Sequence, residues 1–371
     1  MDFSAEDREY MGKALSLAGR GRGMAHPNPM VGAVIVNNAA IVGAGFHRGP
    51  HTPHAEAAAL ARAGEGARGS TLYVTLEPCN HQGRTPPCTD AIIAAGVKRV
   101  VIAALDPNPS VKGGGAERLK EAGLEVEAGL MAARSSRLNE AYEKYVTTGM
   151  PLVVLKMAAT ADGKVATASG SSQWITGVKA RRLVHSMRRE SDAVLVGRGT
   201  VQRDDPELTV RMVPLRDARP PARVIVDSRL SMPLECKLAS GGEPPVIVAT
   251  TADHDRGKAQ VLRSRGIRVL EIAGSRERVD LRGLLHELGR MEIAGLLVEG
   301  GPTLVASFLE EGLADRLALF LAPRAFGDAH ARGWVEGMKI DDPSQGLPLR
   351  WKRARKVGED MLLEADFREG E

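Results

Sequence analysis

The sequence predicts an α/β protein that folds as two consecutive domains. The first observation is length, because 371 residues exceed what one hydrophobic core usually organises. The second is the alternation of short apolar runs of strand length with helical patterns along most of the chain. The third is composition: 43% apolar residues with only 4% aromatics predict cores of Leu, Val, Ile and Ala. We expect one domain in residues 1–148 and a second in residues 149–371.

The first expected domain begins with a helix whose start resembles a capping box at Ser4 and Asp7. Two apolar runs, residues 31–36 and 41–46, follow and predict a β-hairpin. A single polar helix over residues 132–145 closes the domain. Between these ends the expected strands are residues 71–76, 99–105 and 124–128, and the expected helices are residues 54–63, 89–95 and 116–122.

The second expected domain begins after a short junction, residues 147–151, that contains a glycine and a proline. Helical patterns fall between several of its apolar runs, so a second α/β series is indicated. Two stretches, residues 211–223 and 325–348, are typical of surface loops or insertions. The expected strands are residues 152–157, 193–196, 224–226, 246–249, 268–272, 296–298 and 317–321.

Charge, cysteine content and hydropathy exclude several classes of protein. A formal charge of +4 is small for this length, so it permits phosphorylated small-molecule partners and does not indicate a nucleic-acid surface. Three cysteines are too few for a disulfide framework and favour a reducing compartment. No apolar run is long enough for a membrane span, and the start lacks the basic and apolar pattern of a secretory signal. We therefore expect a cytoplasmic protein without membrane contact.

One constellation in the first domain predicts a metal site. His54 lies at a loop-to-helix junction, Cys79 follows a strand, and Cys88 opens the next helix. One imidazole and two thiolates suit Zn²⁺ and leave its fourth position for water. Glu56, two residues after the histidine, is then the proton carrier of a zinc deaminase rather than a ligand.

Alternatives to this zinc site stay open. His54 can be a simple helix N-cap, and buried cysteines are often inert. His81 lies between the two cysteines and can compete as a ligand, whereas Cys236 lies outside the cluster and is expected to be a free structural thiol. A non-catalytic zinc scaffold is disfavoured, since a structural site has no use for the carboxylate of Glu56.

Glycine turns in the second domain indicate a phosphate-binding edge. Residues 300–303 place two glycines after a strand and Pro302 at a helix start, where free backbone N–H groups can hold a pyrophosphate. Residues 197–200 form a second such turn. Neither matches the dinucleotide fingerprint of a Rossmann domain. Arg188 and Arg211 are available for a substrate phosphate.

Residues 26–32, 54–56 and 77–88 resemble the deaminase half of the bifunctional riboflavin-biosynthesis deaminase–reductases. The resemblance implies a cytidine-deaminase-like three-layer α/β/α domain. It also implies hydrolysis of the 2-amino group of a diaminopyrimidinone that carries a ribosylamino 5′-phosphate. In this family Asn28 would hold the ring, and Arg84 or His81 would help to bind the substrate. Asn28 can also be a plain turn residue between two prolines.

Residues 156–164, 171–177, 191–201, 204–211 and 298–304 extend the resemblance to the reductase half. They imply a dihydrofolate-reductase-like α/β domain that uses NADPH to deliver hydride to C1′ of the ring-opened sugar imine. Association into homo-oligomers is implied as well. By the same resemblance NADPH is bordered by Ala158, Trp174, Thr200, Asp204, Ser228 and residues 301–307, which include Gly301, Pro302, Thr303 and Leu304. The substrate is bordered by Ser172, Arg188, Leu208, Arg211 and Glu299.

Plain structural roles compete with some of these assignments. Trp174 can be a packing aromatic, Glu299 a helix-dipole partner, and Asp204 part of a turn, although Asp204 is also a candidate proton donor. Ser228 and Arg229 end a predicted strand and suit the 2′-phosphate of NADPH, if Arg229 is not merely a solvated charge. Asp227 beside them is expected to turn away and cap the turn. A nucleic-acid-editing zinc deaminase with an accessory domain is the alternative function.

Overall fold

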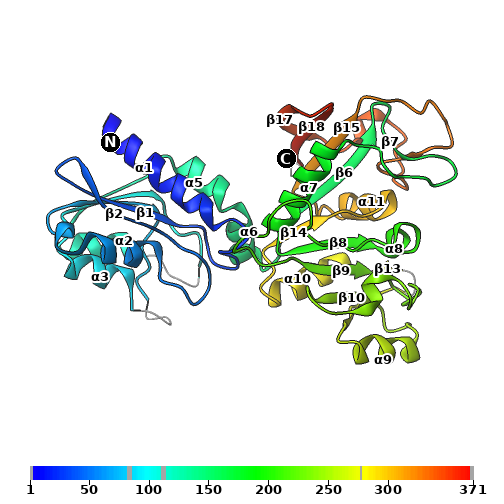
Figure 1. Ribbon diagram of the computed structural model, residues 1–371, viewed down its shortest axis with the longest axis horizontal. Helices are drawn as coiled ribbons and strands as arrows, with labels where there is room; N and C mark the ends of the chain where they lie inside the picture. The colour runs from blue at the N-terminus through cyan, green and yellow to red at the C-terminus, as the bar shows by residue number, and fades with distance from the viewer. Residues whose placement is uncertain (1–2, 82–85, 110–113, 276–277, 368–371) are drawn as a thin grey trace. The chain divides into compact units, whose positions relative to one another are not determined.

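The computed structural model of the chain describes residues 3–81, 86–109, 114–275 and 278–367. Its contacts divide the chain into two compact units, Met1–Met150 and Pro151–Glu371, and Figure 1 labels many of the elements of both. Each unit contains its own sheet with helices packed on it. The α/β class predicted for both halves is confirmed.

The first unit is a five-stranded sheet in the order β2-β1-β3-β4-β5. Its hairpin of β1 and β2 is antiparallel, β1 is antiparallel to β3, and β3, β4 and β5 run parallel. The strands are β1 (Gly32–Asn37), β2 (Ala40–Phe46), β3 (Thr71–Leu76), β4 (Arg99–Ala104) and β5 (Glu125–Ala128). The helices are α1 (Ala5–Ala18), α2 (Ala55–Ala63), α3 (Cys88–Ala94), α4 (Gly115–Glu121), α5 (Ala132–Leu138) and α6 (Glu140–Thr148).

Two hydrophobic cores lie on opposite faces of this sheet. One packs α2, α3 and α4 through residues such as Ala59, Ile92 and Leu119 against Ile35 and Leu72. The other packs α1 through residues such as Met11 and Leu15 against the opposite face. The unit therefore has the three layers, helices–sheet–helices, that the resemblance implied.

Helix α1 begins with the capping box that the sequence predicts. Ser4 Oγ accepts a hydrogen bond from Asp7 N, and the Asp7 carboxylate accepts one from Ser4 N, each at 3.0 Å. The same carboxylate also accepts from Tyr73 Oη at 2.8 Å and from Arg99 Nη1 at 2.7 Å. These bonds tie the first turn of α1 to strands β3 and β4.

Our prediction of one helix over residues 132–145 is wrong. Helix α5 ends at Leu138 and α6 starts at Glu140, with Asn139 between them. The side-chain amide of Asn139 accepts a hydrogen bond from Met30 N at 2.7 Å and donates one to Met30 O at 3.1 Å. This pairing with a distant backbone group interrupts the helix, and local periodicity cannot show it.

The second unit is built on a nine-stranded sheet in the order β11-β10-β9-β8-β14-β6-β15-β18-β17. Seven neighbouring strands, β11 to β15 in this order, run parallel, and β18 is antiparallel both to β15 and to the edge strand β17. The strands are β6 (Leu152–Thr160), β8 (Ala193–Gly197), β9 (Ala222–Val226), β10 (Val246–Thr250), β11 (Arg268–Glu271), β14 (Gly295–Val298), β15 (Arg316–Ala322), β17 (Leu349–Val357) and β18 (Asp360–Phe367).

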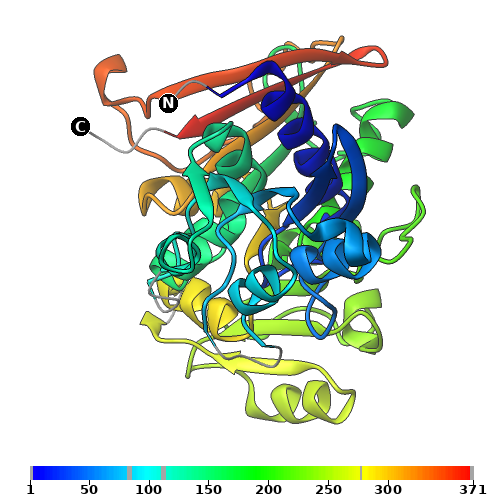
Figure 2. The same cartoon turned by 90° about the vertical axis from the view of Figure 1, so that its left-hand side faces the viewer.

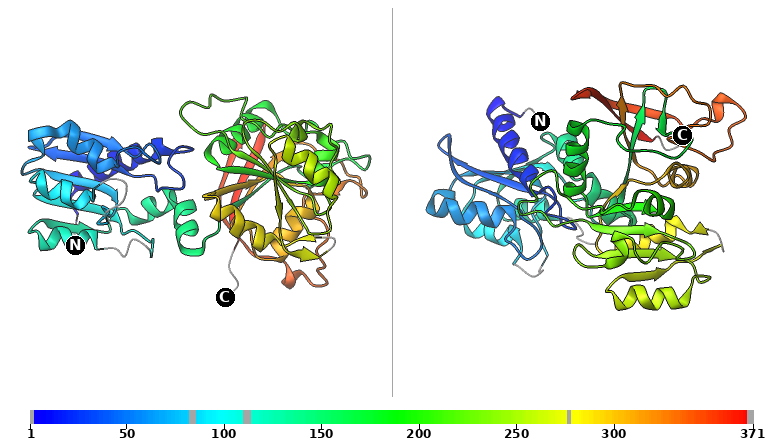
Figure 3. Two further views of the ribbon diagram at one scale, coloured as in Figure 1. Left: turned by 90° about the horizontal axis from the view of Figure 1, so that it is seen from below. Right: turned by 45° about the vertical axis from the view of Figure 1, so that its right-hand side comes forward.

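Helices cover both faces of this twisted sheet, which is seen nearly end-on in the left panel of Figure 3. They are α7 (Val178–Glu190), α8 (Arg198–Asp204), α9 (Arg256–Ser264), α10 (Leu281–Arg290) and α11 (Pro302–Glu310). The sequence reading missed the β17–β18 hairpin, the long red ribbon pair in Figure 2. Strand β17 is polar and exposed over most of its length, so it lacks the apolar run by which strands were predicted.

Short ladders extend the sheet framework outside the main sheet. Strand β7 (Lys164–Ala166) pairs with β16 (Arg332–Gly333), and β12 (Gly274–Ser275) pairs with β13 (Arg278–Val279). The first ladder brings part of the stretch 325–348, which we expected to be loop, back to the end of β6. No helix among the described residues is both long and apolar enough to cross a membrane.

Candidate functional site

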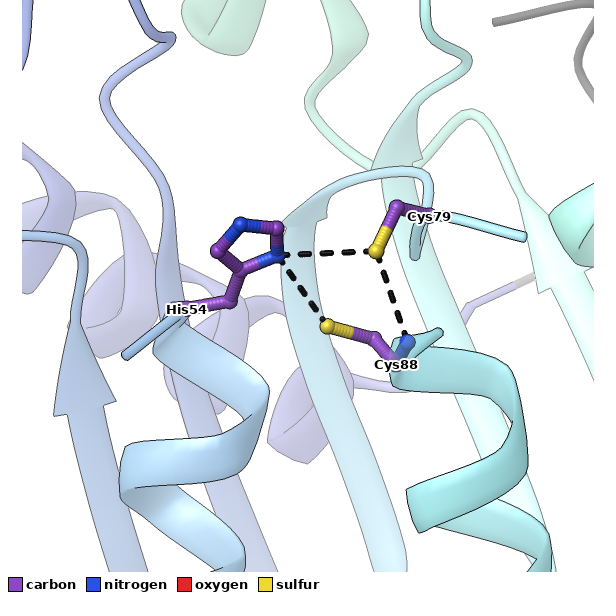
Figure 4. A group of neighbouring side chains, drawn as sticks. All are labelled: His54, Cys79 and Cys88. Carbon is purple, nitrogen blue, oxygen red and sulfur yellow. Dashed lines mark hydrogen bonds between the residues drawn. The ribbon is translucent and has the colours of Figure 1, made fainter. Parts of the chain in front are cut away.

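Three side chains of the first unit converge as the sequence predicts. His54 Nδ1 lies 3.3 Å from Cys88 Sγ and 3.5 Å from Cys79 Sγ, and Figure 4 shows this nitrogen facing both sulfurs. Cys88 N donates to Cys79 Sγ at 3.4 Å. All three potential ligand atoms lie within 4.8 Å of one another. One imidazole and two sulfurs form a donor set that fits Zn²⁺.

The ends of three elements place these donors. His54 occupies the N-cap position of α2 but makes no capping bond with its side chain, so the imidazole is available as a ligand. Cys88 is the first residue of α3, and Cys79 comes shortly after β3. Glu77 fixes the end of β3, because its carboxylate accepts from Ala116 N at 3.0 Å and from Asp106 N at 3.2 Å.

Protons are shared unequally within this cluster. Hydrogen bonding with Cys88 and with His54 lowers the pKa of Cys79 to about 4. Hydrogen bonding with Cys79, together with burial, raises the pKa of Cys88. Hydrogen bonding to Cys79 also raises the pKa of His54. Zn²⁺ binding needs deprotonated sulfurs and a neutral imidazole, so the metal displaces these shared protons.

Glu56 lies in the first turn of α2, two residues after His54, and is 3% exposed. Burial raises the pKa of its carboxyl group to about 7. Buried carboxylates without a cation partner are uncommon in cores. A buried carboxyl group with a raised pKa beside a metal-binding cluster, such as that of Glu56, is typical of an acid–base group.

Asn28 reaches the same region through a histidine that the sequence reading missed. Asn28 Nδ2 lies 3.0 Å from His47 Nε2, and His47 Nδ1 lies 3.2 Å from Pro53 O. The His47 ring packs edge-on against His54, with 5.3 Å between ring centroids. His47 is 3% exposed, and burial lowers its pKa. Since Pro53 O can only accept, neutral His47 carries its proton on Nδ1 and accepts from Asn28.

The other residues weighed for this site have different environments. His81 is exposed and is not a member of the three-residue cluster. Arg84 lies outside the described residues. Cys236 is a free, buried thiol in the core of the second unit, as predicted. In the second unit, most residues predicted for the reductase site line two cavities.

The first cavity, of about 500 Å³, lies at the carboxyl ends of β8, β9 and β14. Ligands of open parallel sheets commonly bind at this edge, where the N-termini of the following helices also point. Gly301 is the N-cap of α11, and Pro302 is its first residue, as predicted. The predicted cofactor residues that line this cavity are Thr200, Ser228, Gly301, Pro302, Thr303 and Leu304.

The second cavity, of about 530 Å³, shares Thr200, Gly301 and Pro302 with the first. Its lining contains all the predicted substrate residues, namely Ser172, Arg188, Leu208, Arg211 and Glu299. It also contains the remaining predicted cofactor residues, Ala158, Trp174 and Asp204. Of the residues predicted for the reductase half, all but Val305 and Ala306, which are buried in the core, border one or both cavities.

A buried charge network lines the second cavity. Arg188 forms a two-pronged pair with Glu299, with Nε 2.6 Å from Oε1 and Nη2 3.0 Å from Oε2. Lys156 Nζ lies 3.9 Å from Glu299 Oε2. Burial alone would raise the pKa of Glu299, but Arg188 and Lys156 bring it below its ordinary value. Glu299 is thus held as a carboxylate by two cations.

For four residues of the second unit, the geometry bears on the structural role that competes with a role in binding. Trp174 is 60% exposed, with Arg181 stacked 4.5 Å from its ring centroid, so it is not a core aromatic. Asp204 ends α8 and accepts from Ser172 Oγ at 3.1 Å. Asp227 accepts from Ser231 Oγ at 3.1 Å and Met232 N at 2.7 Å, so it caps the turn as expected. Arg229 lines the first cavity.

Several charged or titratable residues that line these cavities were not assigned from the sequence, among them Lys156, His185 and Arg332. Lys156 is a single charged residue in an otherwise apolar strand, a signal that could have been used. His185 on α7 and Arg332 on β16 had no comparable signal. Arg332 comes from the stretch expected to be loop, and only the β7–β16 ladder brings it there.

Family models match both halves of the chain. The model described as the cytidine and deoxycytidylate deaminase zinc-binding region matches residues 4–104. The model described as the RibD C-terminal domain matches residues 151–363. The fold and the site therefore define a zinc-dependent deaminase joined to an NADPH-dependent reductase.

Similar proteins match along nearly the whole chain. The riboflavin biosynthesis protein RibD of Aquifex aeolicus is 47% identical over 96% of this chain and 97% of its own length. RibD of Escherichia coli is 42% identical over 96% of this chain and 98% of its own length. The Acinetobacter baumannii RibD structure superposes with a TM-score of 0.89 at 40% identity, over 98% of this chain and 99% of that one.

A Thermotoga maritima structure, described as a diaminohydroxyphosphoribosylaminopyrimidine deaminase and 5-amino-6-(5-phosphoribosylamino)uracil reductase, has a TM-score of 0.84 at 36% identity. It covers 98% of this chain and 99% of its own. The chain belongs to the RibD family of riboflavin biosynthesis proteins. Its activities are those of a deaminase and a reductase that act on small phosphorylated pyrimidines with Zn²⁺ and NADPH. This result favours the riboflavin assignment over a nucleic-acid-editing deaminase.

Proposed function

We propose that the first unit hydrolyses the 2-amino group of 2,5-diamino-6-(5-phosphoribosylamino)pyrimidin-4-one. The second unit then reduces the ribosyl group of the product, 5-amino-6-(5-phosphoribosylamino)uracil, to ribityl. The observation that carries the first step is the His54, Cys79 and Cys88 cluster with buried Glu56 two residues from its histidine. The second step is supported by the two cavities at the carboxyl edge of the large sheet, which share lining residues.

In the deamination, His54, Cys79 and Cys88 would hold Zn²⁺, which supplies the acidity that makes water a nucleophile at neutral pH. Glu56 takes the proton from the attacking water as the new C–O bond forms at C2. It passes this proton to the ring nitrogen, where the proton stays. It then transfers the second proton, from the hydroxyl group now on C2, to the amino group, which leaves as ammonia when the C–N bond breaks and the C=O bond forms. The two protons and the oxygen of water are thereby distributed between the uracil product and ammonia.

Asn28 would hold the pyrimidine ring in this step. Its Nδ2 donates to neutral His47, as derived above, which fixes the orientation of the amide. The carbonyl oxygen Oδ1 is then the group available to accept from a ring N–H of the substrate. This geometry favours a binding role for Asn28 over that of a plain turn residue.

In the reduction, NADPH supplies hydride when bound, and the protein orients it against the substrate. Ser228 and the start of α11 would hold its phosphates, while Thr200, Gly301 and Pro302 lie where the two cavities meet. Hydride would reach C1′ of the ring-opened imine, and a proton would reach the imine nitrogen. Asp204 is the candidate donor of that proton, because it lines the substrate cavity and bonds Ser172.

The substrate phosphate would bind Arg211. The Arg188 fork is already paired with Glu299 and also donates from Nη1 to Thr209 O at 3.0 Å. The Arg211 side chain is 50% exposed, and its Nη1 lies 3.3 Å from Glu207 Oε2. A dianionic phosphate can replace this exposed contact through charge-assisted hydrogen bonds. Arg188 would instead fix Glu299 beside the substrate.

Two variants of the full chain test the deaminase assignment. We expect Glu56→Gln to keep about one zinc per chain while ammonia release falls roughly 10²- to 10⁴-fold, because the amide keeps the shape but cannot carry the proton. We expect Cys88→Ala to lose the zinc itself. Metal analysis and an ammonia assay on the diaminopyrimidine phosphate check both results. Full zinc retention in Cys88→Ala would refute the ligand set, and an active Glu56→Gln enzyme would refute the proton carrier.

The setting of the enzyme is also part of the proposal. Three cysteines without a disulfide among them, two of which would bind zinc, suit a reducing, cytoplasmic compartment. We expect no nucleic-acid partner and association into a homo-oligomer. Light scattering of the purified protein, with and without added RNA, measures both properties.

A further inference from the structure

The segment that carries Arg211 has no regular secondary structure of its own. It follows α8, and residues 205–211 belong to neither a helix nor a strand. Leu208 within it is 2% exposed and has a φ of 57°, in the left-handed region that non-glycine residues rarely adopt. A segment of this kind keeps its conformation only if neighbouring groups hold its backbone.

Two side chains of α7 hold this backbone at two points. Arg188 Nη1 donates to Thr209 O at 3.0 Å. Arg211 N donates to His185 Nδ1 at 3.2 Å. His185 and Arg188 are three residues apart on the helix, so they lie on the same face. Both also line the substrate cavity. Arg188 donates to the carbonyl group before Val210, and His185 accepts from the N–H group after it, so the backbone is held on both sides of Val210.

The contact to Arg211 requires a neutral imidazole. A backbone N–H can only donate, so Nδ1 must be free of a proton and the ring carries its proton on Nε2. His185 is 5% exposed, and burial together with the cations Arg188 and Arg211 lowers its pKa to about 4. The charge of Glu299 and a hydrogen bond with the Thr209 backbone raise the pKa of His185, but burial and the two cations outweigh them. His185 therefore remains an acceptor at neutral pH.

We infer that His185 is a positioning residue of the reductase site, which fixes the Arg211 backbone so that the guanidinium meets the substrate 5′-phosphate. This inference rests on the proposed phosphate-binding role of Arg211. Arg188 holds the carbonyl group of Thr209, two residues earlier, whereas His185 is the side chain that bonds the Arg211 peptide itself. His185 thus acts on substrate affinity through Arg211 and has no part in hydride transfer.

Matched variants of the full-length enzyme separate this role from a general packing role. In His185→Asn, the amide oxygen takes the place of Nδ1 and can still accept from Arg211 N. In His185→Gln, the amide lies one methylene further out, and in His185→Leu no acceptor remains. We expect His185→Gln and His185→Leu to raise KM for 5-amino-6-(5-phosphoribosylamino)uracil roughly tenfold, the equivalent of about 1.4 kcal/mol. His185→Asn should restore KM to within about twofold, and KM for NADPH should stay unchanged.

A double-mutant cycle with Arg211→Ala tests separately whether His185 acts through Arg211 and whether Arg211 binds the substrate phosphate. If His185 acts through Arg211, His185→Gln should change KM less than about twofold in the Arg211→Ala background. Full additivity, equal losses in the Asn and Gln variants, or a matching rise in KM for NADPH would overturn the positioning role. An unchanged KM in Arg211→Ala alone would instead overturn the proposed function of Arg211. Urea unfolding of each variant, followed by the fluorescence of the tryptophans, which all lie in the second unit, reports whether this unit is folded. The Asn and Gln pair remains decisive if His185→Leu does not fold.

Discussion

At the residue scale, cofactor choice depends on the groups that face the 2′-position of the bound dinucleotide. Ser228 and Arg229 line the first cavity directly after β9. Asp227, the acidic neighbour that would disfavour a phosphate, is 2% exposed and bonded to Ser231 and Met232. Asp227 also borders the cavity, but its carboxylate is buried and bonded within the turn, so Ser228 and Arg229 are the residues of this turn that suit a phosphate. An arginine fork is well suited to two phosphate oxygens.

We predict that Arg229→Ala impairs the reductase selectively with NADPH. Loss of the phosphate contact should lower kcat/KM with NADPH by roughly tenfold or more, equivalent to about 1.4 kcal/mol, while the poor rate with NADH barely moves. Steady-state kinetics with both cofactors measure the effect. Equal losses with both cofactors would indicate a folding defect, and no loss with either would assign the selectivity to other residues.

We also predict that His185 makes the stability of the second unit depend on pH. Its pKa is about 4 in the folded protein and about 6.5 in an unfolded chain. Between these values the unfolded chain binds one more proton, so the free energy of unfolding falls as pH drops from about 6.5 to 4. The slope is at most about 1.4 kcal/mol per pH unit. All three tryptophans, Trp174, Trp334 and Trp351, lie in this unit, so urea unfolding followed by tryptophan fluorescence reports it.

The control for this pH dependence is His185→Asn, which keeps an acceptor but does not titrate. Its unfolding free energy should vary less between pH 7 and pH 5 than that of the unchanged protein. Parallel curves for the two proteins would show that other groups cause the pH dependence.

At the element scale, the position of α2 decides the geometry of the zinc site, because its first turn carries Glu56 and follows His54. Gly43 and Gly45 alternate on β2 and allow this helix to lie directly on the strand. A Cβ at Gly45 would lie 2.5 Å from Ala55 O, and one at Gly43 would lie 2.3 Å from Ala59 O. The obstacle in both cases is helix backbone, which cannot rotate away as a side chain can.

We predict that Gly45→Ala displaces α2 and destabilises the first unit by about 1–3 kcal/mol, the usual range for overpacking. Zinc retention during a chelator challenge should fall as well, since His54 moves with the helix. The matched control is Gly12→Ala in α1, where a Cβ would meet nothing within 4 Å. There alanine should stabilise the helix by up to about 1 kcal/mol. Urea unfolding followed by tyrosine fluorescence measures both, because all four tyrosines lie in the first unit. Unchanged zinc retention in Gly45→Ala would contradict the role of this packing.

At the scale of the whole molecule, two units with separate cores carry the two chemistries. The metal-binding cluster lies entirely within Met1–Met150, and both reductase cavities are lined only by residues of Pro151–Glu371. No described residue of one unit is therefore needed to complete these sites of the other. This division is the basis for treating the two activities as separable.

We predict that Glu56→Gln protein still reduces the deaminated intermediate with NADPH at close to the normal rate. The substitution removes proton transfer in the first unit and changes nothing that lines the reductase cavities. The assay is NADPH consumption with 5-amino-6-(5-phosphoribosylamino)uracil as the substrate. Loss of both activities would mean that the two sites are coupled.

The sequence by itself determined the α/β class, most strands and the residues that come together at the candidate sites. Strands such as β3 and helices such as α2 follow from local apolar patterns, which are properties of short stretches of chain. His54, Cys79 and Cys88 could be predicted as a set because few other chemistries use these residue types together at the ends of successive elements. Their roles, and those of the cavity residues, remain predictions that the experiments above test.

Only the tertiary structure decided the break at Asn139, the β17–β18 edge and the residues that surround Glu299. Asn139 is paired with Met30, more than 100 positions away, and the hairpin of β17 and β18 joins the sheet through the ladder of β18 with the distant strand β15. Lys156, Arg188 and Glu299 come from β6, α7 and the end of β14, and parallel pairing in the sheet brings them together. Such contacts join residues distant in the sequence, so no pattern within a short window can encode them.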